Sequence, residues 1–440
     1  MAKMNFMEFV PQGFSGEDYS EIFGRALVEC AGGTLVVPAG TYRTGSLSLP
    51  SHTHLVLEEG AVIRFLDDFS VYEPVLTRWE GIDCHAMHPL LWINDSHDVT
   101  IEGQGTLDGS GAAWWKYIFE RRAVQTEPEL DVEKRLAALN PGFESQPGGG
   151  GGRQTQFLRP PLLQVQNSRE VSLRGVRLRN SPFWTCHILR SSRVSLEDVS
   201  IANPYDSPNT DGIDIESSVS VSVRRCVVDV GDDGIAIKSG SDVSSVAASE
   251  HILVEDCTVL HAHGGVVIGS ETSGGVHDVR VRNCRFSGTD RGVRIKTRRG
   301  RGGDISRIEV DGVTMDHVIC PFTVNMYYRW GDDGAAPYSL HPQPVTAITP
   351  SVSNLRYRNI VATHCRVAGF FAGLPEMPIR DALFQNVVIA CLPDDGDRYE
   401  VEMFRGIPES QYRGIRLINA DVRFENTDVN IDPPSQMEAY

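Results

Sequence analysis

The chain has 440 residues, of which 41% are hydrophobic and 22% are charged, so it is not a disordered polymer and can bury a large core. Its net charge of −17 argues against nucleic acid or an anionic membrane surface as a partner. No segment approaches the roughly 18 consecutive apolar residues of a membrane helix.

The N-terminus shows no secretion signal, because Met1–Val10 contains no long apolar segment and no cleavage site of small residues. The nine cysteines are an odd number without Cys-x-x-Cys spacing. Such a set is typical of free thiols in a reducing compartment and argues against zinc. We therefore expect a soluble cytoplasmic protein.

Residues 1–50 are predicted to form an N-terminal cap, with a helix over Asp18–Cys30 and a strand over Gly32–Pro38. A repeat fold needs such an end to shield its first coil. The segment is rich in glycine and β-branched residues after the helix, which favours strands and tight turns.

After the cap, a nine-residue pattern recurs with apolar residues at positions 2 and 4 and a Gly, Cys, Asp or Asn near position 6, as in EVSLRGVRL. The alternation indicates a strand with one buried face, and a second short strand follows each copy. A period of roughly 25–30 residues is typical of one coil of a parallel β-helix. We therefore predict an all-β, single-domain right-handed parallel β-helix over residues 1–440. The central copies, spaced 23 to 31 residues apart, begin at Glu170, Arg193, Ser220, His251, Asp278 and Arg307.

Three cysteines, Cys226, Cys257 and Cys284, occupy the same position in successive copies of the pattern. A metal or redox site would be one interpretation. A column of small buried side chains along the core is the interpretation favoured here.

Two long interruptions break the period, at about residues 109–158 and 320–350, and the first contains a predicted helix near Glu127–Ala138. Loops on one side of a repeat array commonly carry function. We predict that both inserts line the substrate cleft.

Polar clusters lie at the turns of consecutive coils. Asn209-Thr210-Asp211-Gly212 is followed 21 residues later by Gly231-Asp232-Asp233-Gly234. Adjacent strands lie about 4.8 Å apart, so the three carboxylates are expected to crowd together. Crowding raises the pKa of one carboxyl and leaves others ionised, which provides the acid and the base that glycosidic hydrolysis requires. Asn209, at the start of the first cluster, is a further candidate for sugar binding.

The next coils add His263 and a basic run from Arg291 to Arg301. Arg294 and Lys296 alternate with Ile295, so both are expected to point out of the coil. Cations beside carboxylates lower the repulsion and can bind a sugar carboxylate. Each motif alone is ordinary turn or loop chemistry, and it is their order at coil-like spacing that indicates a site.

The series NTDG, GDDGIAIKSG, HGGVVIGSE and RIK resembles the polygalacturonase family, glycoside hydrolase family 28. The similarity runs over most of the chain, through GGTLVVPAGTY, GQGTLDG and NSPFWT. The HGGVVIGSE form and the long inserts look more like the bacterial exo-acting branch than the fungal endo-enzymes. The resemblance implies an inverting hydrolase that cleaves α-linked galacturonic acid from pectin-derived oligosaccharides without a metal or cofactor.

Carried over by position, the resemblance implies that Asp232 is the general acid and that Asp211 and Asp233 share the attacking water. His263 would tune the charge of the acid, although the Gly-His-Gly of the family is Ala262-His263-Gly264 here. Inversion needs room for water, so the acid and base carboxyls are expected to lie about 6.5–9.5 Å apart, whereas about 5 Å would indicate retention.

The resemblance also implies that Arg294 and Lys296 hold the galacturonate carboxylate. Family enzymes place a tyrosine some thirty residues later, and either Tyr327 or Tyr328 could be that residue. Further candidates for sugar contact are Arg301, for a second carboxylate, and Trp184 and His187, although Trp184 could equally only pack the coil.

Rival functions stay open. A rhamnogalacturonan galacturonohydrolase or an endo-polygalacturonase would use the same aspartates, and only the pocket would differ. A pectate lyase would instead pair a basic residue with carboxylate-bound calcium, and a non-catalytic carbohydrate-binding β-helix would need no such acidic set. A cytoplasmic location would make imported oligosaccharides the substrate, which favours exo action. The sequence does not indicate an oligomeric state.

Overall fold

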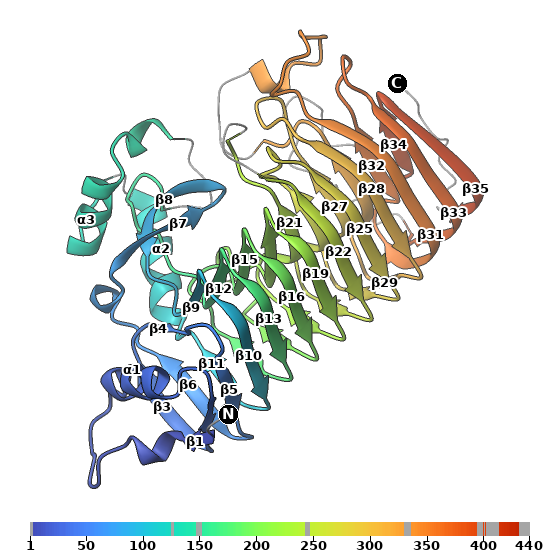
Figure 1. The fold of residues 1–440 in the computed structure, drawn as a ribbon. Coiled ribbons are helices and arrows are strands. Elements are labelled where there is room, and N and C mark those ends of the chain that lie inside the picture. The colour runs from blue at the N-terminus through green and yellow to red at the C-terminus, as the bar shows by residue number, and fades with distance from the viewer. Residues whose placement is uncertain are drawn as a thin grey trace. The chain divides into compact units, whose positions relative to one another are not determined.

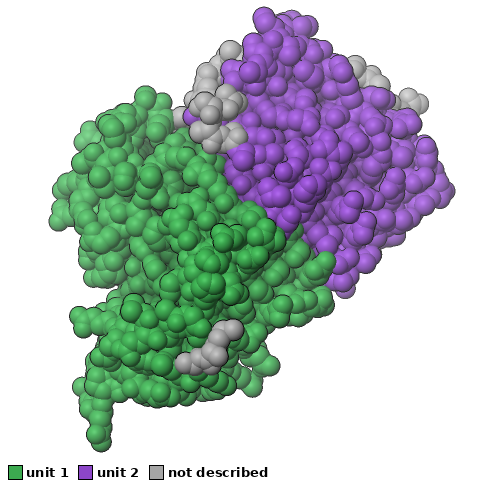
Figure 2. All heavy atoms as spheres, viewed as in Figure 1, with its two compact units in different colours: residues 1–214, 221–231 green, residues 215–220, 232–440 purple. Residues whose placement is uncertain are grey.

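The computed structural model of the protein describes residues 3–124, 127–146, 152–242, 247–329, 336–393, 399, 401 and 413–430 (Figure 1). The chain forms two compact units, one of residues 1–214 and 221–231 and the other of residues 215–220 and 232–440 (Figure 2). Both units are built from short parallel strands, so the predicted all-β, right-handed parallel β-helix class is confirmed. The expectation of a single domain stays a prediction.

The first unit begins with the predicted cap. Helix α1 (Ser20–Glu29) and strand β2 (Thr34–Val37) lie within the helix and strand ranges expected from the sequence. The helix buries Ile22, Phe23, Ala26 and Leu27, one face at helical spacing. The other elements of the cap are β1 (Lys3–Asn5), η1 (Phe6–Glu8), β3 (Gly40–Thr44) and β4 (Leu47–Ser48).

Each coil of the first unit contributes strands to three faces, and the apolar positions of the nine-residue pattern stack into a column. Leu55, Ile101, Leu173 and Leu196 pair in register on successive coils, and each is at most 1% exposed. Burying one such side chain contributes about 1.5–3 kcal/mol, so this column is a main stabilising feature. The strands are β5 (His54–Leu57), β6 (Ala61–Phe65), β9 (Leu91–Asn94), β10 (His97–Gly103), β11 (Thr106–Asp108), β12 (Leu163–Gln166), β13 (Arg169–Arg174), β14 (Arg177–Arg179), β15 (Cys186–Leu189), β16 (Ser192–Glu197), β17 (Ser200–Ala202) and β20 (Val227–Asp229).

Position 6 of the pattern is where the backbone turns into the left-handed region. Gly175, Asp198, Asp256, Asn283 and Gly312 all occupy this position, with φ between 52° and 73°. Gly, Asn and Asp tolerate this conformation better than other residues, which explains the composition of the repeat at this point. The next position carries the predicted cysteine column, whose three thiols are at most 2% exposed.

An antiparallel hairpin of β7 (Pro74–Trp79) and β8 (Ile82–Met87) leaves the coil of the first unit. The first insert packs against it, since Asn140 accepts from the His85 N–H and donates to its carbonyl, both at 2.8 Å. Within this insert, α3 (Asp131–Leu139) confirms the predicted helix, whereas α2 (Ala112–Val124) was not predicted and η3 (Phe143–Ser145) is a single turn. The single turn η2 (Phe69–Val71) precedes the hairpin.

The second unit repeats the same coil, and its long strands β22, β25, β28, β31 and β33 lie side by side in parallel (Figure 1). One sheet contains β22 (Ser249–Glu255), β23 (Thr258–Leu260), β25 (Val276–Arg282), β26 (Arg285–Ser287), β28 (Asp304–Asp311), β29 (Thr314–Asp316), β31 (Ser351–Cys365), β33 (Ile379–Cys391) and β35 (Ala420–Asn430). A second sheet contains β21 (Asp233–Lys238), β24 (Gly264–Gly269), β27 (Arg291–Lys296), β30 (Cys320–Asn325), β32 (Gly369–Ala372) and β34 (Ile415–Ile418).

Strands β18 (Ile213–Glu216) and β19 (Val219–Arg224) contain the boundary between the units. The second predicted insert, 320–350, opens with β30, so the coil continues to Asn325 before it is interrupted; η4 (Ala336–Tyr338) lies beyond. Within the described ranges, no helix is long and apolar enough to cross a membrane.

Candidate active site

In the first unit, Asp211 lies on the turn that leads into β18 and is 3% exposed. The Asp211 carbonyl accepts a hydrogen bond from the Thr185 N–H at 2.8 Å, and the Gly212 carbonyl accepts one from the Cys186 N–H at 3.0 Å. The turn therefore extends the sheet beyond β15. Asp232 and Asp233 belong to the other unit, and the expected approach of Asp211 to them stays a prediction.

A buried arginine that was not predicted holds this turn. Arg159 is fully buried and donates to the carbonyls of Pro182 and Pro208 at 2.8 and 3.0 Å. It also donates to Asn209 Oδ1 at 3.0 Å. Asn209 therefore has a structural partner, and its predicted contact with sugar stays a prediction.

Trp184 and His187 are both buried, at 3% and 1% exposure. Trp184 stacks on Phe183 with ring centroids 5.1 Å apart and meets His187 edge-on at 5.0 Å. His187 Nδ1 lies 2.9 Å from Gln164 Nε2. This packing matches the alternative in which Trp184 supports the coil, and the predicted sugar contacts of both residues stay predictions.

In the second unit, Asp232 and His263 precede neighbouring strands. Asp233 pairs with Gly264 in the register of β21 and β24, which sets the preceding residues side by side. The His263 N–H donates to the Asp232 carbonyl at 2.9 Å, and His263 Nδ1 lies 3.5 Å from Asp232 Oδ1. The same Oδ1 accepts from the Asp233 N–H at 2.9 Å, so the Asp232 carboxyl is fixed on two sides.

Arg294 and Lys296 point to the same carboxylate, as the alternation with Ile295 predicted. Lys296 Nζ lies 2.6 Å from Asp233 Oδ2, and Arg294 Nη1 lies 3.4 Å from Asp233 Oδ1. The Asp233 side chain is fully buried, and both cations expose less than a tenth of theirs. The two predicted sugar-binding cations thus lie directly beside the aspartate pair.

Charge, more than crowding, sets the protonation of the aspartates. Burial alone raises the pKa of Asp232, but His263, Lys296 and Lys238 together lower it below its ordinary value. Burial also raises the pKa of Asp233, and Lys296 with its neighbouring cations again lowers it overall. The expectation that crowding raises the pKa of one carboxyl is therefore wrong for this pair, because the nearby cations outweigh the repulsion.

The carboxyls of Asp232 and Asp233 are close. One oxygen of each lies within 4.8 Å of the other, so this pair does not show the separation of about 6.5–9.5 Å expected between acid and base, and the inverting mechanism stays a prediction. Both oxygens of Asp233 already face a cation, as the distances to Lys296 and Arg294 show.

The structure distinguishes the two tyrosines. The Tyr328 ring lies under both cations, 5.2 Å from Lys296 Nζ and 5.5 Å from Arg294 Cζ. The Tyr327 ring instead lies under Arg299, 5.5 Å from its Cζ. Tyr328 therefore belongs to the cation cluster. Arg301 Nη1 donates to Ser241 Oγ, and its predicted contact with a second carboxylate stays a prediction.

Sequence reasoning missed a second buried ion pair beside this site. Lys238 Nζ lies 3.7 Å from Glu271 Oε2, and both side chains are about nine-tenths buried. The sequence contained a signal for the position of Lys238, because Lys238, Gly269 and Lys296 follow one another at coil spacing. The β24–β27 register aligns Gly269 with Lys296, and Ile237 pairs with Ile268 one position earlier.

Known proteins resemble this chain in sequence and in structure. The profile of glycosyl hydrolases family 28 matches residues 147–365. A probable polygalacturonase of Vitis vinifera is 30% identical over 368 residues, covering 81% of this chain and 67% of the relative. An endo-polygalacturonase of Pectobacterium parmentieri is 26% identical and covers 71% of each chain. Another plant relative, from Arabidopsis thaliana, is longer, and the chain spans 45% of it.

Among solved structures, a hyperthermoactive exopolygalacturonase from Thermotoga maritima is 28% identical, with a TM-score of 0.76 over 98% of this chain and 92% of that one. The matched profile includes Asp211, the Asp232–Asp233 pair and His263. The chain therefore belongs to glycosyl hydrolase family 28 and is a glycoside hydrolase.

Proposed function

We propose that the protein is an inverting exo-polygalacturonase that removes α-linked galacturonic acid from pectin-derived oligosaccharides. The observation that carries the proposal is the pair of buried cations, Arg294 and Lys296, beside the Asp232–Asp233 carboxyls. Buried cations next to an acid–base pair suit a sugar that itself carries a carboxylate. The names of the family relatives, which are polygalacturonases of several kinds, support the same substrate class.

In the proposed reaction, Asp232 donates a proton to the glycosidic oxygen, while water attacks the anomeric carbon from the opposite face. Asp233, together with Asp211, takes the proton of that water. The substrate carboxylate approaches Lys296 and Arg294 and offsets part of their charge, which relieves the lowering of the pKa of Asp232. Binding of the correct substrate would thus favour the protonated acid.

Exo action is supported by the hairpin β7–β8 in the first unit. The Thr77 hydroxyl lies 3.0 and 2.9 Å from Oε1 of Gln164 and Gln166 on β12, so the hairpin covers this strand on the sheet face that includes β15. Trp79 anchors the hairpin by stacking on Phe183 at 4.8 Å. A covered face on the N-terminal side of the Asp211 turn would stop a longer chain from extending there. An endo-acting enzyme needs that path open.

One time course tests the proposal. Tetragalacturonate incubated with the protein and EDTA should first give saturated monogalacturonate and trigalacturonate, with the released monogalacturonate in its β-anomeric form, because inversion of an α-linkage gives the β-anomer. Proton NMR reads the anomer, the product length and any unsaturation in the same sample. Digalacturonate as the first product from tetragalacturonate would contradict the removal of single terminal residues, an α-anomer would indicate retention, and an unsaturated product would indicate a lyase. No cleavage would shift the choice to a rhamnogalacturonan-derived substrate.

A pH profile tests the role of His263. Burial lowers its pKa, but Asp232 raises it overall above the ordinary value, so the His263–Asp232 pair keeps a proton to higher pH than a carboxyl alone. In His263→Asn that proton must stay on Asp232. The pKa of Asp232 rises when the imidazolium is lost. The carboxyl of the variant nevertheless loses its proton at a lower pH than the imidazolium of the wild type loses its own.

We therefore expect the alkaline limb of kcat to move to lower pH in His263→Asn, measured between about pH 4 and pH 8. His261→Asn is the matched control, since His261 is an exposed histidine of the same coil with φ of 41°. If the alkaline limb stayed in place in His263→Asn, His263 would not affect the protonation of Asp232.

A further inference from the structure

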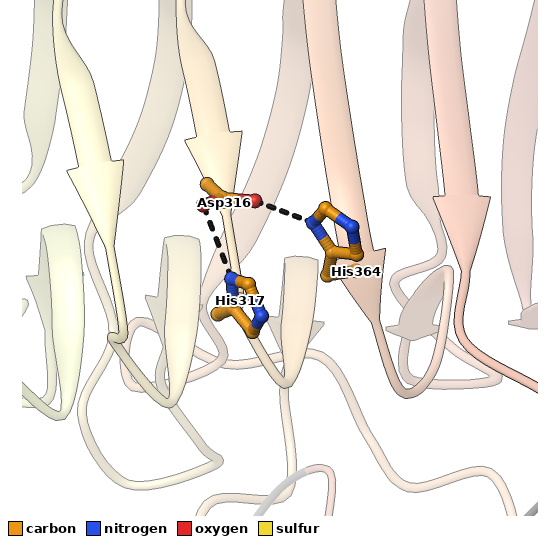
Figure 3. A group of neighbouring side chains, drawn as sticks. All are labelled: Asp316, His317 and His364. Atoms are coloured by element: carbon orange, nitrogen blue, oxygen red, sulfur yellow. Dashed lines mark hydrogen bonds and ion pairs between the residues drawn. The ribbon is translucent and has the colours of Figure 1, made fainter.

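A second cluster of ionisable side chains lies in the same unit as Asp232 and Asp233 but on the other sheet. Asp316 ends β29, His317 follows it in the turn, and His364 lies near the end of β31 (Figure 3). Asp316 pairs with Thr363 in the register of these strands, which brings His317 and His364 together on successive coils. The catalytic residues instead lie on and before β21, β24 and β27.

The three side chains converge on one point. His364 Nδ1 lies 2.7 Å from Asp316 Oδ1, and His317 Nδ1 lies 3.1 Å from Asp316 Oδ2, as the dashed lines in Figure 3 show. The two imidazoles are nearly parallel, with centroids 4.5 Å apart and an interplanar angle of 19°. One ligand atom from each residue lies within 4.8 Å of the others. All three side chains are at least 37% exposed, so an ion can reach them from solvent.

We propose that Asp316, His317 and His364 bind a divalent transition-metal ion, with Zn²⁺ as the preferred ion. Zinc takes imidazole nitrogen and carboxylate oxygen at about 2.0–2.2 Å, which sets neighbouring ligand atoms roughly 3.3–3.5 Å apart in a tetrahedral site. The 2.7 Å contact between His364 and Asp316 would therefore lengthen by less than about 1 Å as the ion enters between them. Each neutral imidazole then carries its proton on Nε2 and directs the Nδ1 lone pair at the metal. Water completes the coordination on the exposed side.

The ligand set selects the class of ion. Two imidazoles suit zinc, copper or nickel, whereas calcium and magnesium prefer oxygen ligands throughout. A hydrogen bond also fixes the orientation of the Asp316 carboxylate, because the Thr363 hydroxyl donates to Asp316 Oδ1 at 3.0 Å. Such an outer partner is typical of protein metal sites. The bound ion would join the turns of two successive coils, so its role would be to stabilise this end of the second unit.

A comparable group, Glu250, His251 and Asp278, is less suited to an ion. Arg307 already binds both oxygens of Asp278, at 2.8 and 3.0 Å, and the imidazole of His277 lies 3.1 Å from one of them. A guanidinium in that place opposes a second cation. At Asp316, the two candidate imidazoles themselves make the charged contacts.

The test is a titration of the whole protein with Zn²⁺, and with Co²⁺ as a spectroscopic probe whose visible absorption reports nitrogen and oxygen ligands. His317→Asn and His364→Asn remove one ligand each. Both histidines have φ near 55°, a conformation that asparagine tolerates, so these variants should fold. His52→Asn is the matched control, because His52 also has a positive φ, of 62°, and faces a single carboxylate at 3.0 Å.

We expect one Zn²⁺ per chain at this site, absorption by its Co²⁺ form, and a higher thermal midpoint with Zn²⁺ than with EDTA. Each ligand variant should bind at least about 100-fold more weakly, and Thr363→Val about 10-fold more weakly, while His52→Asn binds as wild type. The proposal is overturned if wild type takes up no Zn²⁺, if both ligand variants keep wild-type affinity, or if Ca²⁺ binds there in preference. Hydrolysis in EDTA is measured separately, so failure of this proposal leaves the proposed function intact.

Discussion

Asp232→Asn is expected to lower kcat on trigalacturonate by about 10²- to 10⁴-fold, the range that a positioned general acid contributes. The substitution removes the proton that the leaving oxygen needs and changes little else. Asparagine keeps an Oδ1 to accept the Asp233 N–H, and the backbone bond from His263 to residue 232 does not involve the side chain. The variant should therefore unfold at nearly the wild-type temperature.

The matched control is Asp256→Asn, an exposed aspartate of the second unit with φ of 56°, where asparagine is equally tolerated. It should keep wild-type kcat. Rates are measured by release of monogalacturonate, and folding is measured by circular dichroism during heating. If Asp232→Asn kept more than about a tenth of wild-type kcat, the smallest effect expected of a general acid would be missing, and the proton would have to come from another group.

The coil was predictable from the sequence because its determinants are local. Alternating apolar residues set the buried column, and a Gly, Asp or Asn at position 6 sets the turn, as Gly175 and Asn283 show. The hairpin β7–β8 and helix α2 escaped prediction for the opposite reason. They leave the repeat, and their positions depend on contacts with distant residues, such as Trp79 on Phe183.

The candidate site was predictable wherever coil spacing alone brings residues together. Asp232 and His263 follow one another at that spacing, and the structure unites them. The choice of Tyr328 over Tyr327 required ring positions, which no spacing gives. The pKa directions also required distances, because the effect of a cation depends on whether it lies at 2.6 Å or several ångströms further away.

Lys296→Met is expected to have the largest effect on stability, because it removes the ammonium that lies 2.6 Å from the fully buried Asp233 carboxylate. Breaking a buried ion pair by removing one partner costs about 3–5 kcal/mol of the free energy of unfolding. The variant should also lose most of its activity, since the same ammonium is proposed to bind the substrate carboxylate. Urea unfolding and kcat/KM on trigalacturonate measure the two effects.

A pH series follows from the sign of the pKa shifts. In wild type the pKa of Asp233 is lowered, so its stabilising contribution is present above the ordinary carboxyl pKa and is lost only as pH falls toward the lowered value. In Lys296→Met burial dominates and the pKa of Asp233 rises. Its carboxyl then takes up a proton in mild acid, so the stability difference from wild type should be largest near neutral pH and should shrink as pH falls.

The double variant Asp233→Asn/Lys296→Met separates stability from function. Asparagine can still accept from Arg294, now 3.4 Å from Asp233 Oδ1, and no buried carboxylate is left without its ammonium. The double variant should therefore regain much of the stability that Lys296→Met loses, a coupling of the kind that contacting residues show. It should stay inactive, because both the proposed base and the proposed carboxylate-binding cation are gone. Recovery of activity together with stability would mean that Lys296 serves the fold alone and that another cation binds the substrate.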